Sequence, residues 1–121
     1  MAKVYRVQDQ FGRGPWKPGF SHLWVDSRQD HENLLPGYIE FPNWLNRVYT
    51  WETLGHGCAT KDQLKRWINE AEYKILTNHG YQAVELEVNR IIDKSSTQCV
   101  FAKIGPLFQD AVAFDLYGDC E

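Results

Sequence analysis

Alternating apolar and polar residues predict β-strands, most clearly in the second half of the chain. Residues 81–88 place apolar side chains on one side and mainly charged ones on the other, which is typical of a half-buried strand. Residues 98–104 predict a second strand after a polar turn, and we expect the two strands to pair as a hairpin. Residues 3–8 predict a short strand, and the apolar stretch 111–118 predicts an edge strand.

Apolar residues at helical spacing predict one long helix over residues 61–78. Thr60 is a suitable N-cap, and Gln63 stands three residues later, as in a capping box. Gly80 suits the left-handed position that follows the last helical turn. The apolar stripe consists of Leu64, Trp67, Ile68, Ala71 and Ile75.

These elements predict a single α+β domain over residues 1–121, in which one long helix packs on a small antiparallel or mixed sheet. A chain of 121 residues has the length of one domain with its own core. No internal repeat and no composition shift suggests a boundary within it.

The segment from Gly12 to Phe20 has three Gly and two Pro, so it predicts irregular backbone rather than a helix or a central strand. It also carries large apolar side chains, which a solvated linker does not need. A loop held by aromatic residues is a common way to shape a pocket. The aromatic residues in and around this segment are Phe11, Trp16, Phe20 and Trp24.

Composition narrows the classes of function. Aromatic residues make up 14% of the chain, and they either fill the core or line a recognition surface. A net charge of −3 argues against nonspecific nucleic-acid binding, which needs a basic face to neutralise phosphates. No apolar run approaches the roughly 18 residues of a membrane span, and the N-terminus does not resemble a signal peptide. We therefore expect a cytoplasmic protein, located in the host cytoplasm if a phage encodes it.

Three cysteines, Cys58, Cys99 and Cys120, are widely spaced and form no Cys-x-x-Cys pair. We expect free thiols in a reducing cytoplasm and no metal site, because no two metal-ligating residues share a tight loop or a helix face.

The stretch Gly55-His56-Gly57-Cys58 lies just before the predicted helix. We expect a hinge that lets the chain turn into the helix. The alternative is an anion-binding loop at a helix N-terminus, in which His56 is a functional donor. The order Thr60-Lys61 is not that of a phosphate-binding P-loop.

A second candidate site consists of Arg6 and two acidic residues, Glu85 and Glu87. Carboxylates two positions apart on a strand project from the same face, where they are either solvated or used for acid–base and electrostatic work. Arg6 lies between apolar residues on its strand, so it reaches solvent, pairs with a carboxylate such as Glu85 or Glu87, or holds a ligand phosphate.

The Val-Tyr-Arg strand and the Glu-Leu-Glu strand resemble two motifs of arginine-class ADP-ribosyltransferases. That resemblance implies an enzyme that uses NAD, with Arg6 and Glu85 assisting the catalytic carboxylate of Glu87. The family's Ser-Thr-Ser strand lies between these motifs, whereas Ser95-Ser96-Thr97 follows them here.

The same resemblance implies a cofactor site for NAD. Arg6 would contact a phosphate, Tyr5 or Trp16 would lie against the nicotinamide, and His56 is a further candidate contact. The enzyme hypothesis requires Arg6 and the acidic pair to converge on one hollow walled by the N-terminal aromatic segment.

The chain as a whole also resembles small uncharacterised proteins of phages and their bacterial hosts, in its Gly-Arg-Gly-Pro-Trp and Gly-Tyr-Gln-Ala-Val segments. This resemblance implies a non-catalytic protein that binds and inhibits a host protein, such as an anti-CRISPR-like inhibitor of a defence system. The partner would be a host or phage protein, recognised through aromatic anchors. A structural module of a larger assembly is a third reading.

Overall fold

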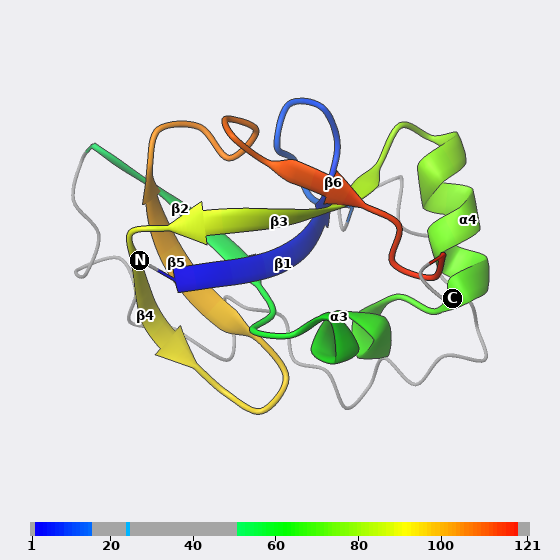
Figure 1. Ribbon diagram of the computed structural model, residues 1–121, viewed down its shortest axis with the longest axis horizontal. Coiled ribbons are helices and arrows are strands. Elements are labelled where there is room, and N and C mark those ends of the chain that lie inside the picture. The colour runs from blue at the N-terminus through cyan, green and yellow to red at the C-terminus, as the bar shows by residue number, and fades with distance from the viewer. Residues whose placement is uncertain (1, 16–23, 25–50, 119–121) are drawn as a thin grey trace.

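The computed structural model describes residues 2–15, Trp24 and residues 51–118. No helix in these ranges is long and apolar enough to cross a membrane. The elements, in chain order, are β1 (Ala2–Gln8), β2 (Glu52–Gly57), α3 (Lys61–Trp67), α4 (Glu70–Asn78), β3 (Gln82–Val88), β4 (Arg90–Lys94), β5 (Cys99–Ile104) and β6 (Val112–Phe114) (Figure 1).

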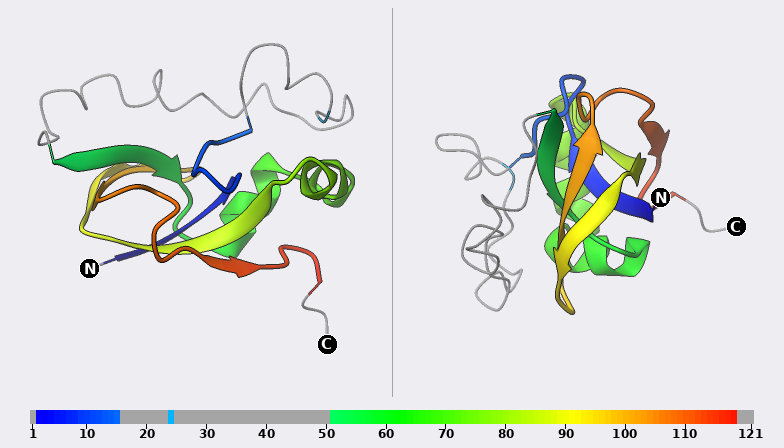
Figure 2. Two further views of the ribbon diagram at one scale, coloured as in Figure 1. Left: turned by 90° about the horizontal axis from the view of Figure 1, so that it is seen from above. Right: turned by 90° about the vertical axis from the view of Figure 1, so that its left-hand side faces the viewer.

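The described part of the chain is mostly β-structure. Two three-stranded antiparallel sheets have the orders β1-β3-β6 and β2-β5-β4. Figure 2 shows the sheets as two layers, with the helices beyond one end of them. The predicted α+β fold with one long helix on a single sheet is therefore wrong, because the predicted strands divide between two sheets and the helix divides into two.

A single run of backbone belongs to both sheets. Only Asn89 separates β3 from β4, and its backbone N–H donates to the carbonyl of Ala102 at 3.1 Å. Its side-chain Oδ1 accepts from the N–H of Ile104 at 2.7 Å. The chain thus changes sheets at a bend, as strands at the corner of two packed sheets do.

Because of this bend, the predicted hairpin is not formed. The strands predicted at residues 81–88 and 98–104 are present as β3 and β5, but they lie in different sheets. β5 instead forms a hairpin with β4, a strand that was not predicted from the sequence. The predicted strand at residues 3–8 and the edge strand near the C-terminus are confirmed as β1 and β6.

A second connection joins the sheets on the other side. Tyr5 and Cys58 exchange two backbone hydrogen bonds, each 2.8 Å long, so the end of β2 pairs with the middle of β1. The two sheets are consequently linked at two corners, and the space between them is filled by one apolar cluster. That cluster comprises Val4, Val84, Leu86, Val88, Cys99, Phe101 and Leu107.

The hinge predicted for residues 55–58 is wrong, and the close approach of Phe101 to Gly55 gives another reason for the glycine. These residues continue β2, where Gly55 is the direct cross-strand partner of Phe101. A Cβ added at Gly55 would lie 2.5 Å from Cζ of the Phe101 ring, which no real contact allows. Glycine is therefore needed in this strand because an aromatic ring occupies the place of its side chain, not because the chain turns there.

The helical region contains two helices because the chain leaves helical geometry at Ile68, whose φ is −139° and ψ 111°. Asn69 then caps a new helix: its side chain accepts from the N–H of Glu72, and Glu72 accepts from the N–H of Asn69, both at 2.8 Å. The predicted helix over residues 61–78 missed this reciprocal capping box. Its predicted ends are confirmed, since the Thr60 side chain caps α3 and Gly80 has a φ of +88°.

Restarting the helix changes which side chains are buried. Ala71 and Ile75 continue the predicted stripe, yet both are exposed in α4. Tyr73 and Leu76 take their place against the end of the first sheet. A second core cluster lies under the helices and comprises Val7, Trp24, Cys58, Leu64, Ile68, Tyr73, Leu76, Tyr81, Ala83 and Leu116.

Replacing Asn69 by Ala tests the importance of the helix break. Asn69→Ala removes the side-chain half of the capping box and keeps the backbone N–H that donates to Glu72, so it is expected to lower the free energy of unfolding by about 1 kcal/mol. Urea denaturation measures the change. Asn78→Ala, at the exposed end of the same helix, provides the matched control and is expected to stay close to wild type. Equal losses in the two variants would contradict the assigned role of Asn69.

Candidate functional site

Strand register places the predicted transferase residues on two different faces of the first sheet. Arg6 pairs with Val84, whereas Tyr5 pairs with Glu85. Directly paired residues of an antiparallel sheet share a face, and successive residues alternate between faces. Arg6 therefore faces the second sheet, while Glu85 and Glu87 lie on the opposite face. The single hollow that the enzyme hypothesis requires is not formed, and the catalytic roles of these residues gain no support from the geometry.

The acidic pair lies on a face that is partly open to solvent. Glu85 forms an ion pair with Lys3 at 3.4 Å, and Glu87 is exposed. Tyr5, on the same face, packs edge-on against Phe114 with ring centroids 6.0 Å apart. This arrangement is typical of the outer face of a sheet, where such ion pairs contribute little to stability. Trp16, the other candidate for the nicotinamide, lies outside the described residues.

His56 is on β2, paired with Val100, and its neighbour Gly55 faces the other way. Within the described ranges its buried Nε2 has no hydrogen-bond partner. Burial lowers the pKa of His56, and the charge of Arg6 lowers it further. The imidazole is therefore neutral at pH 7.

A turn at residues 9–13 presents one aromatic side chain to solvent. The carboxylate of Asp9 accepts from the backbone N–H groups of Phe11 and Arg13, both at 2.9 Å. The Phe11 side chain is 58% exposed, and the guanidinium carbon of Arg13 lies 5.2 Å from its ring centroid. The turn is thus held by its own hydrogen bonds while its largest apolar group remains in water.

A second loop, residues 105–111, presents another aromatic side chain. Gln8 donates to the carbonyl of Leu107 at 3.0 Å, and the ammonium of Lys103 donates to the carbonyl of Pro106 at 3.3 Å. Leu107 is buried in the core between the sheets, whereas the neighbouring Phe108 is 51% exposed. The loop is therefore fixed from below and carries Phe108 on its outer side.

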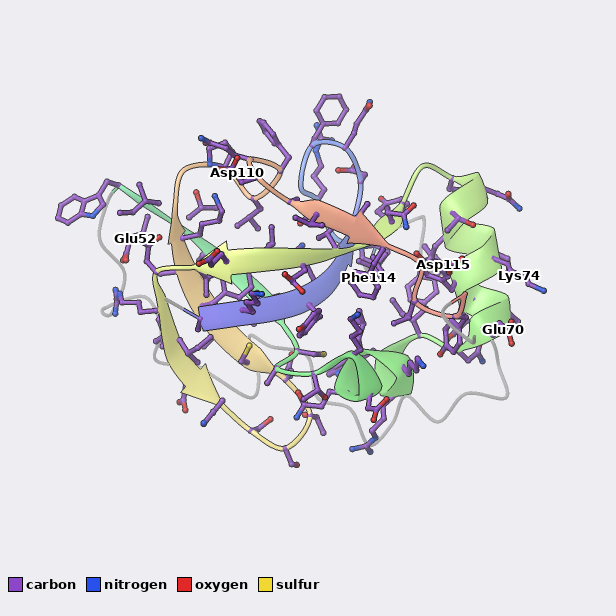
Figure 3. The ribbon with its side chains drawn as sticks, in the orientation of Figure 1. Glu52, Glu70, Lys74, Asp110, Phe114 and Asp115 are labelled. Carbon is purple, nitrogen blue, oxygen red and sulfur yellow. The ribbon has the colours of Figure 1, made fainter. Side chains whose placement is uncertain are left out.

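The two loops pack against each other. A Cβ placed at Gly12 would lie 3.1 Å from Cβ of Leu107 and 3.2 Å from the backbone nitrogen of Phe108. Both loops lie along the same edge of the molecule, which Asp110 marks in Figure 3. We call this region the two-loop surface: Phe11, Arg13 and Phe108, flanked by the exposed Ile104 and Val112. It is the candidate functional site, because large exposed apolar groups close together mark interaction surfaces.

A pocket of about 330 Å³ lies between α4 and the segment that follows β6. Figure 3 labels Glu70 and Lys74 on α4 and Asp115 on the opposite side. The pocket is lined by Glu70, Tyr73, Lys74, Thr77, Gln82, Asp115 and Tyr117.

The polar groups at the base of this pocket serve the fold. The Tyr73 hydroxyl accepts from Gln82 at 2.9 Å and donates to the carbonyl of Phe114 at 3.2 Å, which ties α4 to β3 and β6. The Tyr117 hydroxyl donates to the carbonyl of Ile68 at 2.5 Å. Burial raises the pKa of Tyr117 to about 12, with Glu72 and Glu70 adding to the effect, so this phenol stays protonated.

The thiols of Cys58 and Cys99 are buried and free. Burial raises the pKa of Cys58 to about 12 and that of Cys99 to about 11, so both are poor nucleophiles at neutral pH. Cys120 lies outside the described residues. Within the described ranges, no group of three His, Cys, Asp or Glu side chains could hold a metal ion.

Fold and surface together define a small two-sheet β-protein with an exposed aromatic edge. The chain belongs to the family described as bacteriophage T4 Y00F protein, whose family model matches residues 1–106. It is accordingly a small phage protein, and this family is not the ADP-ribosyltransferase family that its two short motifs resemble. No curated protein and no solved structure matches the chain.

The two-loop surface is only partly predictable from the sequence. Phe11 was among the aromatic residues of the N-terminal segment, but Phe108 was not singled out. Its position in Gly-Pro-Leu-Phe-Gln-Asp is the available signal, because a Phe within a turn-forming stretch is often exposed.

The raised thiol pKa values predict a specific dependence of stability on pH. The unfolded chain releases the Cys58 proton near pH 9, whereas the folded protein retains it to about pH 12. The contribution is therefore complete below pH 9 and is lost as the pH rises above it. Denaturation of a Cys120→Ser protein from pH 8 to pH 11 should show a steeper loss of stability than the Cys58→Ala/Cys120→Ser protein. Parallel pH profiles would contradict the assignment.

Proposed function

We propose that this phage protein acts without catalysis, by binding a host-cell protein through the two-loop surface and inhibiting it. The proposed site of action is the host cytoplasm, and the proposed targets are host proteins that limit phage growth, including defence systems. Membership of a phage protein family supports the setting. The chemistry of the surface supports binding as the mode of action.

The exposure of two Phe side chains on adjacent loops is the observation that carries the proposal. Fully burying an exposed Phe side chain contributes roughly 1.5–3 kcal/mol, and because about half of each side chain is still exposed, a partner that covers both gains about the burial of one Phe. Phe and Arg are also enriched at protein interfaces, and Arg13 lies against Phe11.

The loops are held in place before any partner binds. Phe11 is positioned by the Asp9 hydrogen bonds, and Phe108 follows a residue that is anchored in the core. Binding through such a surface loses little conformational entropy, which favours tight association from a small contact area.

The charge of the chain favours a protein rather than a nucleic acid as the partner. The net charge is −3, and the described residues of the two-loop surface include one cation, Arg13. Binding to nucleic acid draws most of its affinity from several phosphate contacts made by basic residues.

A double variant tests this proposal. Phe11→Ser/Phe108→Ser removes both anchors while leaving the loop hydrogen bonds, which come from backbone groups and from the side chains of Asp9, Gln8 and Lys103. Tagged wild-type protein is used to isolate its host partner, and affinity is then measured with the purified partner. The double variant should bind at least about thirtyfold more weakly, as expected when two interface anchors are lost.

Ile75→Ser is the matched control, because Ile75 is an exposed apolar residue on α4, away from the two loops. It should bind the partner and inhibit it as wild type does. Thermal unfolding checks that all three proteins are folded. Equal affinity of wild type and the double variant, or a surface occupied by a second copy of this chain in solution, would exclude the proposed mode of binding.

A further inference from the structure

Arg6 places a positive charge in the space between the two sheets. It lies on the face of the first sheet that also carries Val4 and Leu86, both fully buried. Its Nε is closed off from solvent and has no partner among the described residues. Its one hydrogen bond there is a long one, 3.4 Å from Nη2 to the carbonyl of Gly12.

No carboxylate in the described ranges forms an ion pair with Arg6. The nearest acidic influence is Asp9, whose carboxylate is already engaged by the N–H groups of Phe11 and Arg13. Burial lowers the pKa of Arg6 to about 10 in spite of Asp9. The guanidinium is therefore desolvated and largely uncompensated, a costly state for a charge inside a protein.

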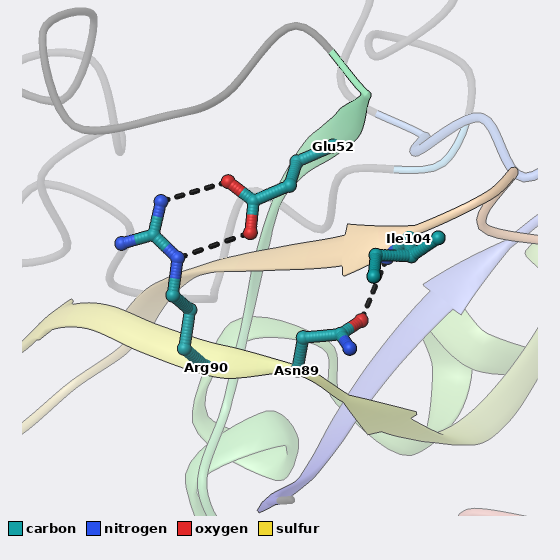
Figure 4. Close-up of polar contacts among 4 residues, drawn as sticks. All are labelled: Glu52, Asn89, Arg90 and Ile104. Atoms are coloured by element: carbon teal, nitrogen blue, oxygen red, sulfur yellow. Dashed lines mark hydrogen bonds and ion pairs between the residues drawn. The ribbon is translucent and has the colours of Figure 1, made fainter.

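Arg90 is another partly buried arginine, and its guanidinium is paired with a carboxylate. Its Nε and Nη2 donate to the two oxygens of Glu52 at 3.0 and 2.7 Å, in a two-point pair (Figure 4). The Glu52 side chain is itself nearly buried. The fold thus supplies a fitted carboxylate to Arg90 and none to Arg6.

Two glycines lie against the terminal nitrogens of Arg6. A Cβ at Gly55 would lie 3.0 Å from Nη1, and a Cβ at Gly14 would lie 3.3 Å from Nη2. Side chains at these positions would press on the guanidinium. Arg6 as a whole keeps some exposure, although its Nε is buried.

We propose that Arg6 binds a small oxyanion, a phosphate or a carboxylate, in the cradle formed by Gly12, Gly14 and Gly55. A planar guanidinium matches two oxygens of either group and so gains both the missing countercharge and two hydrogen bonds. Gly12 belongs to the same turn as Phe11, but the anion site is tested by thermal stability and not by partner binding, so either proposal can fail without the other.

Thermal unfolding with inorganic phosphate or acetate tests the site on the full chain. Ionic strength is held constant with sodium chloride, and the pH is held at 7.5. Phosphate, acetate or both should raise the Tm of the wild-type protein by about 4 °C or more near saturation. The anion that acts identifies the class of ligand.

Arg6→Met should lose this shift and should melt no lower than wild type in the absence of the anion, because it removes an uncompensated charge. Arg13→Met, the same substitution on the exposed turn, should keep the shift. Gly14→Ala fills part of the cradle and should require several-fold more anion for the same effect, which keeps the test valid if Arg6→Met does not fold. Absence of a shift with either anion, or an equal shift in Arg6→Met, overturns the proposal.

Discussion

Contact between the ring of Phe101 and the bare backbone of Gly55, cross-strand partners in the second sheet, shapes the face of that sheet that meets the first. The ring occupies the place where any larger residue of β2 would put its side chain. At the end of β2, a Cβ at Gly57 would lie 3.1 Å from the carbonyl oxygen of Tyr5, and the next residue forms the Tyr5–Cys58 bridge to β1. The same bare stretch leaves the space into which Arg6 extends. The bare backbone at Gly55 and Gly57 thus accommodates an aromatic ring, the approach of β1 at one corner of the fold and a buried charge.

The polar groups of this small core fall into two kinds. Glu52 with Arg90, and Asn69 with Glu72, are pairs in which each member satisfies the other, so they contribute specificity at little cost. Arg6 belongs to the second kind, since its charge is enclosed without a fitted counterpart. Unsatisfied groups of this second kind are uncommon in native cores and concentrate where a ligand supplies what the fold does not.

Much of the strand content could be predicted from the sequence, because the alternation in β3 and the apolar run in β5 reflect burial within each strand. The pairing could not, since the bend at Asn89 depends on a hydrogen bond to Ile104, fifteen residues away. The helix was predicted as continuous because Ile68 and Ala71 fit one apolar period, and periodicity does not detect a cap in the middle. Gly55 indicated a turn, but glycine is needed there because the ring of Phe101, on the neighbouring strand, occupies the side-chain position.

The candidate site was predictable to a lesser degree. An exposed Phe11 follows from its turn-forming neighbours, but the proximity of Phe108 comes from the tertiary packing of Gly12 on Leu107. The two faces occupied by Arg6 and the Glu pair follow directly from the register of β1 with β3, and register is a tertiary property that short motifs do not reveal.

The shared strand that runs through β3 and β4 has a consequence for how the molecule comes apart. β3 is hydrogen-bonded within the first sheet and β4 within the second. The two sheets therefore share one continuous run of backbone. We therefore expect the described part of the chain to unfold as one cooperative unit, in which neither sheet opens without the other.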